Sequence, residues 1–477
     1  MKICVLQPDY TASTVDYRHY DPSRDLTPLL PDHQVDHVAL DKRTTYRQLK
    51  ALGRNGYDLF INLCEGYLEW DVPSIDVIDS LERLELPFTG PPSHLYDPSK
   101  PLMKYVAHTV GVATPAHGLV HDLASAHAAA ALRFPLFVKP AHAGDSLGID
   151  EHALVVDEAA LLRQVARILP SHDLLLVEEF VAGREFTALV LASGVPGVPA
   201  RVFQPVEYHF PSETGFKTYA LKTSDLHPSA NLPVTDPELR AEIESAARRV
   251  FAAFDGVGYA RLDFRMDAAG RLYFLEINFA CSMFYRDGFE GSADHILRHD
   301  GIGQAGFAAL MIAEGMARHQ RRRKRYRMAG NGVDGYGIVA TETLRAGEII
   351  FRGEGRAHRL VTRRHVKATW SPEQQQTFGR YAVPLDDEVY VIWDADPSEW
   401  APQNHSCDAN TSYDGLNVVA TRPIAVGEEL TLDYATMMNE LSEPFQCRCG
   451  SPGCRGWIHG VAGESLSARE AARTAIR

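Results

Sequence analysis

The sequence lacks any apolar run long enough to span a membrane, so we expect no segment to cross a bilayer. Its opening stretch, MKICVLQPDY, has neither the apolar core nor the cleavage site of a signal peptide. Positive charge is scarce: 48 Lys and Arg stand against 62 Asp and Glu, and a net charge of -14 argues against general binding to nucleic acid or anionic membranes. Seven cysteines among 477 residues are too few for a disulfide framework. We therefore predict a cytoplasmic protein with no nucleic-acid or membrane partner.

The composition, 45% apolar and 23% charged, is typical of a soluble globular protein, and the length favours two or three domains. Short apolar runs such as LFINLC alternate with helix-like stretches near the start, which predicts an α/β fold there, while short β-like segments predominate from residue 335. Helices are expected near 157–169 and 236–254. The fold class is therefore multidomain, α/β followed by β-rich. The predicted segments are 1–95 (small α/β domain), 96–315 (strand-rich domain), 316–334 (basic linker), 335–440 (β-rich domain), 441–460 (cysteine motif) and 461–477 (tail).

The run YARLDFRMDAAGRLYFLEINF, residues 259–279, alternates polar and apolar residues on both sides of a turn at DAAG. With a two-residue loop, Arg261 lies opposite Glu276 and Asp263 is a diagonal neighbour. Two carboxylates and the amide of Asn278 then converge beside an arginine, and such hard oxygen ligands suit Mg²⁺ that carries nucleotide phosphates. On this run alone, an amphipathic hairpin with a solvated polar face is the slightly favoured interpretation.

A second polar cluster precedes this run. The stretch FPLFVKPAHAGDSLGI ends a predicted strand at Lys139 and continues into a loop that contains Gly144, Ser146 and Gly148. Small residues in such a loop let backbone N–H groups approach phosphate. The later stretch LLLVEEFVAGREFTALVL predicts a strand, a turn and another strand.

Taken in this order, residues of about 60–315 resemble the ATP-grasp superfamily, and within it the D-alanine–D-alanine ligase group. The resemblance implies that ATP and Mg²⁺ are bound. For the nucleotide it implies phosphate contacts from Lys100, Lys139, Lys222 and the loop at Ser146, adenine contacts from Glu178 and Val181, and a ribose contact from Glu185. For the chemistry it implies magnesium ligands Asp263, Glu276 and Asn278, with Arg261 stabilising a tetrahedral intermediate.

The implied reaction is phosphorylation of a carboxylate, followed by attack of an amine on the acyl phosphate. The substrate side departs from the family pattern. Its N-terminal glycine-rich segment, with a glutamate that holds the first D-alanine, is absent from MKICVLQPDYTASTVDY, and Ser282 in ACSMF stands where the family has the glycine of a Pro-Gly pair. We therefore do not expect a cell-wall D-alanine ligase.

A cysteine motif lies near the end of the sequence, where FQCRCGSPGCRGW places Cys447, Cys449 and Cys454 within eight residues. Three thiolates are one short of a structural zinc site. Among the other cysteines, Cys407 lies in the polar, turn-rich stretch APQNHSCDANTSYD and is the best fourth ligand, whereas Cys4 lies in an apolar run that favours burial. The alternative is a set of free thiols in a glycine-rich loop.

This arrangement resembles the SET-domain methyltransferases with their post-SET cysteine motif, over residues of about 335–457. GYGIVATETLRAGEII, NHSCDAN and GEELTLDYA carry the resemblance, which implies S-adenosylmethionine as methyl donor. It implies that Gly335, Tyr336, Gly337, Asn404 and His405 hold this cofactor, that Tyr434 lies at the methyl-transfer site, that Tyr381 lines the channel for the amine, and that Trp457 covers the cofactor once Zn²⁺ folds the tail. Leu432 stands where the family commonly has an aromatic residue, which leaves the number of methyl groups open.

The two resemblances together predict a bifunctional enzyme, an ATP-dependent carboxylate-amine ligase fused to an N-methyltransferase. Its expected partners are a small-molecule or peptide carboxylate, an amine, and a methyl-accepting amine that includes a protein lysine among the candidates. The alternative is a protein-lysine methyltransferase whose first half only binds nucleotide, as the departure at Ser282 suggests. A non-enzymatic scaffold is the third hypothesis.

Overall fold

The structure is a computed structural model, and it divides the chain into two compact units, residues 1–322 and 323–477. None of the helices it describes is both long and apolar enough to cross a membrane. The described residues are 1–11, 13, 21–66, 71–142, 150, 152–210, 230–331, 335–353, 356, 358–393, 401–439 and 441–459.

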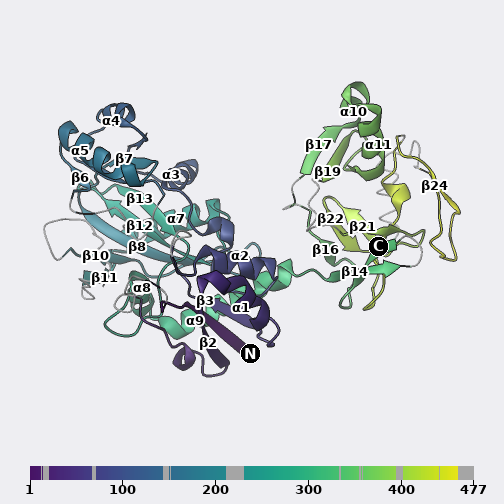
Figure 1. Ribbon diagram of the computed structural model, residues 1–477, viewed down its shortest axis with the longest axis horizontal. Helices are drawn as coiled ribbons and strands as arrows, with labels where there is room; N and C mark the ends of the chain where they lie inside the picture. The colour runs from purple at the N-terminus through teal and green to yellow at the C-terminus, as the bar shows by residue number, and fades with distance from the viewer. Residues whose placement is uncertain are drawn as a thin grey trace. The chain divides into compact units, whose positions relative to one another are not determined.

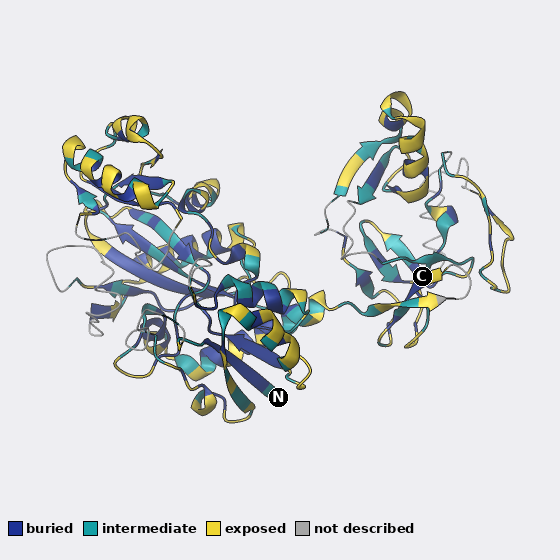
Figure 2. Cartoon of the chain, in the orientation of Figure 1, coloured by how far each residue is buried: buried dark blue, intermediate teal, exposed yellow. Residues whose placement is uncertain are grey.

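The first unit begins with a parallel three-stranded sheet in the order β2-β1-β3, built from β1 (Lys2–Pro8), β2 (Gln34–Leu40) and β3 (Leu59–Asn62). Helices α1 (Thr45–Leu52) and α2 (Ile75–Arg83) pack on one face. Helices α8 (Ser292–Asp300) and α9 (Gly303–Arg322), which come much later in the sequence, pack on the other face. With both faces covered, the central strand is almost wholly buried (Figure 2), and the predicted α/β domain is completed by residues beyond 290.

A second sheet is antiparallel, in the order β4-β7-β5-β6. Its strands are β4 (His117–Val120), β5 (Leu136–Pro140), β6 (Leu154–Val155) and β7 (Leu175–Glu179). Helices α4 (Leu123–Ala129) and α5 (Glu158–Ile168) cover one face (Figure 1). The expected helix near 157–169 is confirmed, and Asp157 caps it by accepting a hydrogen bond from the N–H of Ala160 (2.7 Å).

The largest sheet lies against α3 (Lys100–Thr109) and α7 (Pro237–Ala253), which share its core. The strand order is β11-β10-β8-β12-β13, with β9 paired to β8. The expected helix near 236–254 is confirmed as α7. The strands are β8 (Arg184–Leu191), β9 (Arg201–Val202), β10 (Val206–Tyr208), β11 (Asn231–Pro233), β12 (Tyr259–Met266) and β13 (Leu272–Asn278).

The turn between β12 and β13 has three residues instead of the two expected. The N–H of Asp267 donates to the carbonyl of Arg271, and the Asp267 carboxylate accepts from the N–H groups of Ala269 and Arg271 (2.9 Å each). Gly270 closes this turn with a φ of 79°, a conformation that glycine adopts without strain.

The longer turn and a bulge between Asp263 and Phe264 together change the register of the hairpin. The predicted pairing of Arg261 with Glu276 is therefore wrong. Asp263 lies directly opposite Glu276, and Arg261 lies opposite Asn278. The four polar side chains still share one face, because the turn and the bulge together shift the partner of Glu276 by two residues, from Arg261 to Asp263, and side chains alternate with a period of two.

The predicted basic linker at 316–334 also needs correction. Residues 316–322 are the last turns of α9, where Arg318 is buried and pairs with Glu314 (3.3 Å), and basic side chains at a helix C-terminus are favoured by its dipole. Residues 326–331 form β14 (Tyr326–Asn331), which pairs with β15 (Gly335–Ala340) as part of the second unit.

The second unit is β-rich, as expected, with short strands in small sheets ordered β14-β15, β16-β22-β21, β17-β19-β18, β20-β23 and β24-β25. Helices α10 (Arg363–Thr369) and α11 (Pro372–Tyr381) pack on β19 through Val366, Phe378 and Tyr390. The remaining strands are β16 (Ile349–Phe351), β17 (His358–Thr362), β18 (Val383–Pro384), β19 (Val389–Trp393), β20 (Asn404–His405), β21 (Thr411–Asp414), β22 (Asn417–Ala420), β23 (Thr431–Leu432), β24 (Phe445–Gln446) and β25 (Trp457–Ile458).

Candidate functional site

The polar face of β12 and β13 carries two carboxylates, an amide and a guanidinium. Arg261 donates to Asp263 from Nε (3.3 Å) and Nη2 (3.2 Å). Burial lowers the pKa of Arg261, but the Asp263 carboxylate outweighs it, so the pKa lies above its usual value and the charge is permanent. Asn278, beside Arg261 in the ladder, has a buried Nδ2 without a hydrogen-bond partner among the described residues.

Two predicted phosphate lysines lie beside this face. Lys100 is the first residue of α3, and its N–H donates to the carbonyl of Ala141 (3.1 Å), just beyond the strand that carries Lys139. Burial lowers the pKa of Lys100 to about 8, and the carboxylate of Glu276 opposes this shift. The charges of Lys100, Lys139 and Glu276 therefore act on one another across three elements.

A buried ion cluster joins this site at Glu178 on β7. Its Oε2 pairs with Nζ of Lys104 (2.6 Å), and its Oε1 pairs with Nζ of Lys139. Burial alone would raise the pKa of Glu178, but the two ammonium groups reverse this and lower it to about 2. Lys104 was not predicted from the sequence, although it stands four residues after Lys100 and thus on the same side of α3.

The other predicted nucleotide contacts are distributed around β7 and β8. Val181 is buried in the connection between these strands, and Glu185 on β8 lies 3.6 Å from Nη1 of Arg265. Ser146 and Lys222 fall outside the residues that the structure describes, so their roles remain predictions.

Ser282, the departure from the family pattern, lies in the connection after β13. Its hydroxyl donates to Oε2 of Glu65 (2.5 Å), which follows β3 in the N-terminal sheet. Sequence reasoning missed Glu65, because nothing in NLCEGY distinguishes it from a solvated loop glutamate.

In the second unit, the two predicted cofactor segments at 335–337 and 404–405 meet around Asn404, together with Glu429 from the motif GEELTLDYA. Its Nδ2 donates to the carbonyl of Tyr336 (3.0 Å) and to the carboxylate of Glu429 (2.8 Å). A Cβ at Gly337 would lie 2.2 Å from the Glu429 carboxylate and 2.9 Å from the Asn404 amide, so a side chain there would displace one of them.

Tyr434 lies beside the same segments. Its hydroxyl donates to the carbonyl of Gln403 (2.6 Å), and its N–H donates to Nδ1 of His405 (3.1 Å). Tyr381, at the end of α11, is 64% exposed, and Trp457 on β25 is 55% exposed. The roles assigned to these two side chains remain predictions.

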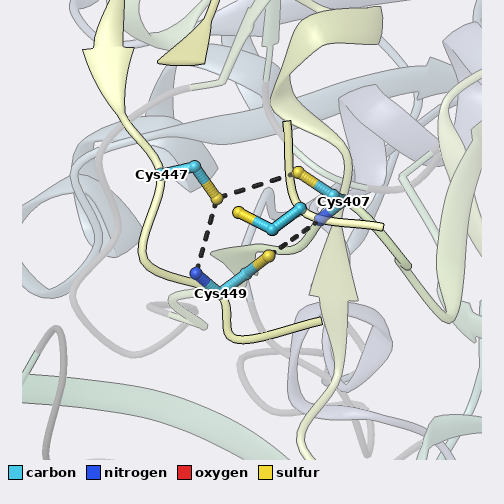
Figure 3. A group of neighbouring side chains, drawn as sticks. Cys407, Cys447 and Cys449 are labelled. Carbon is cyan, nitrogen blue, oxygen red and sulfur yellow. Dashed lines mark hydrogen bonds between the residues drawn. The ribbon is translucent and has the colours of Figure 1, made fainter. Parts of the chain in front are cut away.

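The four predicted cysteines come together (Figure 3). Their sulfur atoms all lie within 4.8 Å of one another, and Sγ of Cys407 lies 3.8 Å from Sγ of Cys447. A tetrahedral zinc site with Zn–S bonds of about 2.3 Å requires sulfurs about 3.8 Å apart. Backbone N–H groups of Cys407, Cys449 and Arg455 point at these sulfurs at 3.4–3.5 Å, which favours thiolates.

These features define a class: an ATP-grasp fold followed by a SET domain. A family model described as D-ala D-ala ligase C-terminus matches residues 108–285, and a SET domain model matches residues 335–435. A solved structure of D-alanyl-alanine synthetase A from Vibrio cholerae covers 66% of this chain and 99% of its own, with a TM-score of 0.50 and 17% identity, and supports the fold alone.

Curated relatives extend this likeness to the sequence. The D-alanine–D-alanine ligase of Ectopseudomonas mendocina is 33% identical over 177 residues, 37% of this chain and 53% of the relative. That of Bordetella petrii is 31% identical over 239 residues, 49% of this chain and 70% of the relative. The chain spans about half the length of the first of these ligases. It belongs to the D-alanine–D-alanine ligase family through its first unit and carries a SET domain in its second.

Proposed function

We propose that the first unit is an ATP-dependent ligase that joins a carboxylate to an amine through an acyl phosphate. The observation that carries this proposal is the polar face of the hairpin, where Asp263 and Glu276 pair across the ladder beside Asn278, with Lys100 and Lys139 next to it. Two carboxylates and an amide oxygen form a donor set that suits Mg²⁺, which would offset the charge of the transferring phosphoryl group.

The residues assigned to ATP follow the family pattern: Lys100, Lys139, Ser146 and Lys222 at the phosphates, Glu178 and Val181 at adenine, and Glu185 at ribose. Arg261 keeps its positive charge at every relevant pH and faces the same site, which suits it to stabilise the oxyanion of the tetrahedral intermediate.

The test is ADP release by the full chain with Mg-ATP across pools of carboxylates and amines. Activity that depends on the pool is expected, and Asp263→Ala should lower it at least about 100-fold because the metal loses a ligand. Asp79→Ala removes an exposed carboxylate on α2 and serves as the matched control. Undiminished turnover in Asp263→Ala would contradict the assignment.

For the second unit we propose an N-methyltransferase that uses S-adenosylmethionine. Gly335, Tyr336, Gly337, Asn404 and His405 would hold the cofactor, and the absence of a side chain at Gly337 leaves the close packing against Asn404 intact. The bound cofactor would supply an activated methyl group. Tyr434, anchored to the Gln403 carbonyl, would orient the accepting amine, with Tyr381 at its channel.

The four cysteines are assigned to Zn²⁺, since their sulfur spacing matches a tetrahedral site, and Trp457 would follow the folded tail onto the cofactor. Tyr434→Phe removes one hydroxyl and should lower methyl transfer at least about tenfold, while Tyr326→Phe, on β14, should not. Equal rates in Tyr434→Phe and wild type would contradict the role.

With both activities in one chain the protein is bifunctional. The product of the ligation is one candidate for the methyl acceptor. If the protein binds ATP but releases ADP with no pool of acids and amines, the result favours the second hypothesis, a protein-lysine methyltransferase whose first half only binds nucleotide. Each activity is therefore assayed on the same full-length preparation.

A further inference from the structure

A crevice lies where the parallel strands of the N-terminal sheet end. In the order β2-β1-β3, the two strands that follow β1 in the sequence lie on its two sides, and ligands of open α/β sheets bind at such switch points, outside the carboxyl ends of the strands. Glu65 follows β3, and Arg24 lies in the connection after β1. Ser282 and Tyr285 reach the same place from the connection after β13, the strand that carries Asn278.

Two carboxylates meet in this crevice. Glu65 accepts hydrogen bonds from Arg24 Nη1 (3.1 Å) and from the Ser282 hydroxyl (2.5 Å), and its side chain keeps 21% of its surface exposed. Asp21 pairs with Arg24 Nη2 (3.2 Å) and accepts from the Tyr285 hydroxyl (2.6 Å). Among the residues that the structure describes, two negative groups thus share a single guanidinium, and this excess favours a cationic ligand.

Arg24 is committed to the protein itself. Besides the two carboxylates, Nη2 donates to the carbonyl of Leu63 (2.9 Å) and Nη1 to that of Met283 (3.3 Å), and the side chain is 2% exposed. Its guanidinium also lies over the ring of Tyr285, 4.9 Å from the centroid. Arg24 therefore holds the crevice together with both of its Nη groups, and its buried Nε is the donor without a hydrogen-bond partner among the described residues.

The crevice has room beside Asp21 and Arg24, and electrostatic interactions connect it to the proposed ligation site. Arg24, Asp21 and Tyr10 line a cavity of about 290 Å³ between the ends of β1 and β2. The charges of Arg261 and Glu65 both act on the thiol of Cys281, in the connection after β13.

We propose that this crevice binds the amine substrate as its ammonium ion against Glu65, that Glu65 accepts a proton from it, and that the substrate class is a primary amine without a carboxylate beside the nitrogen. The inference rests on the proposed ligase function and deepens it. A free amino acid would bring a second anion toward Glu65 and Asp21, where the guanidinium of Arg24 already pairs with both carboxylates, whereas an amino-acid amide, a peptide N-terminus or an alkylamine would not.

The proton balance of the step is complete. The ammonium R–NH₃⁺ transfers one proton to the Glu65 carboxylate, and the nitrogen lone pair forms the bond to the acyl carbon. The bond from that carbon to the phosphate oxygen breaks, and the departing phosphate takes the second proton. The products are the amide, HPO₄²⁻ and neutral Glu65, which returns its proton to solvent. Burial raises the pKa of Glu65 to about 7, which suits a group that must gain and lose a proton near neutrality.

The test compares nucleophiles on the full-length protein with Mg-ATP and the carboxylate found by the ADP screen. Alaninamide and alanine differ only in the group beside the amine, and hydroxylamine is already uncharged at neutral pH, so it traps an acyl phosphate without a base. In the wild type we expect kcat/KM for alaninamide at least about tenfold above that for alanine. In Glu65→Gln, amide formation should fall at least about 100-fold, and hydroxamate formation far less.

Two further variants separate chemistry from folding. Glu65→Asp keeps a carboxylate and should retain more amide formation than Glu65→Gln, and Glu158→Gln, an exposed glutamate on α5, is the matched control. Equal loss of amide and hydroxamate in Glu65→Gln, equal loss in both Glu65 variants, or a preference for alanine over alaninamide would overturn the inference. Absence of hydroxamate in the wild type with every carboxylate would instead overturn the ligase function on which it rests.

Discussion

Replacing Lys104 by methionine tests the ion cluster that joins α3 to β5 and β7. Methionine fills a similar volume but removes the ammonium that lies 2.6 Å from Glu178 Oε2, in a place where the two side chains are 1% and 5% exposed. One oxygen of a buried carboxylate then loses its partner, and breaking such a pair costs about 3–5 kcal/mol. We therefore expect a large loss of stability in the first unit from this single substitution.

The lowered pKa of Glu178 gives a similar free energy for the stabilisation by this cluster. Its fall from the ordinary 4.5 to about 2 corresponds to about 3 kcal/mol, contributed by Lys104 and Lys139 together against the effect of burial. Because the pKa is depressed in the folded state, this contribution is fully present above pH 4.5 and is lost as the pH falls through about 2. Lys104→Met should therefore cost most at neutral pH and progressively less in that acid window.

Hydrogen exchange of the amides in β5 and β7, followed by mass spectrometry, reports the free energy of opening where the cluster lies. Arg83→Met, which removes an exposed pair with Asp79 on α2, should cost less than about 1 kcal/mol and is the matched control. If Lys104→Met increases exchange in β5 and β7 no more than this control does, the cluster does not stabilise the first unit and the reasoning is refuted.

Two predictions concern the second unit. Gly337→Ala places a methyl group 2.2 Å from the Glu429 carboxylate, so it should weaken S-adenosylmethionine binding at least about tenfold by calorimetry. Gly330→Ala is the control, because its added Cβ would meet its nearest neighbour at 3.6 Å and should leave the affinity unchanged. Equal affinities in the two variants would contradict the assignment of Gly337 to the cofactor site. Cys407→Ser removes one of four sulfurs and should reduce bound zinc well below one ion per chain by elemental analysis, with faster exchange over 445–459; full zinc occupancy would show that Cys407 is not a ligand.

The hairpin at 259–279 shows where sequence reasoning succeeds and where it stops. Strand alternation has a period of two, so the sequence shows that Arg261 and Asp263 share one face of their strand and that Glu276 and Asn278 share one face of theirs. The partner of each residue across the ladder depends on the length of the turn and on a bulge, and DAAG is compatible with more than one turn.

Contacts between residues distant in sequence are the second feature that limits prediction of the site from the sequence. The spacing of three cysteines near the C-terminus predicts metal, and the fourth, Cys407, could be selected by residue type and polarity. Lys104 and Glu65 gave no comparable signal, because a lysine in a helix and a glutamate in a loop are most often solvated. Their partners, Glu178 and Ser282, are 74 and 217 residues away along the chain.

The sequence by itself thus determined the two fold classes, the polar face of the hairpin and the ligand types of the cysteine cluster, because local periodicity and spacing encode these features. Only the tertiary structure decided that Glu178 is shared by two lysines and that Glu65 lies against Ser282 with Arg24 committed beside them. Such pairings form between strand ends and helices distant in sequence. These pairings form because packing excludes water from the charged groups, which then need a partner inside the protein. A local sequence pattern does not predict which residue that partner is.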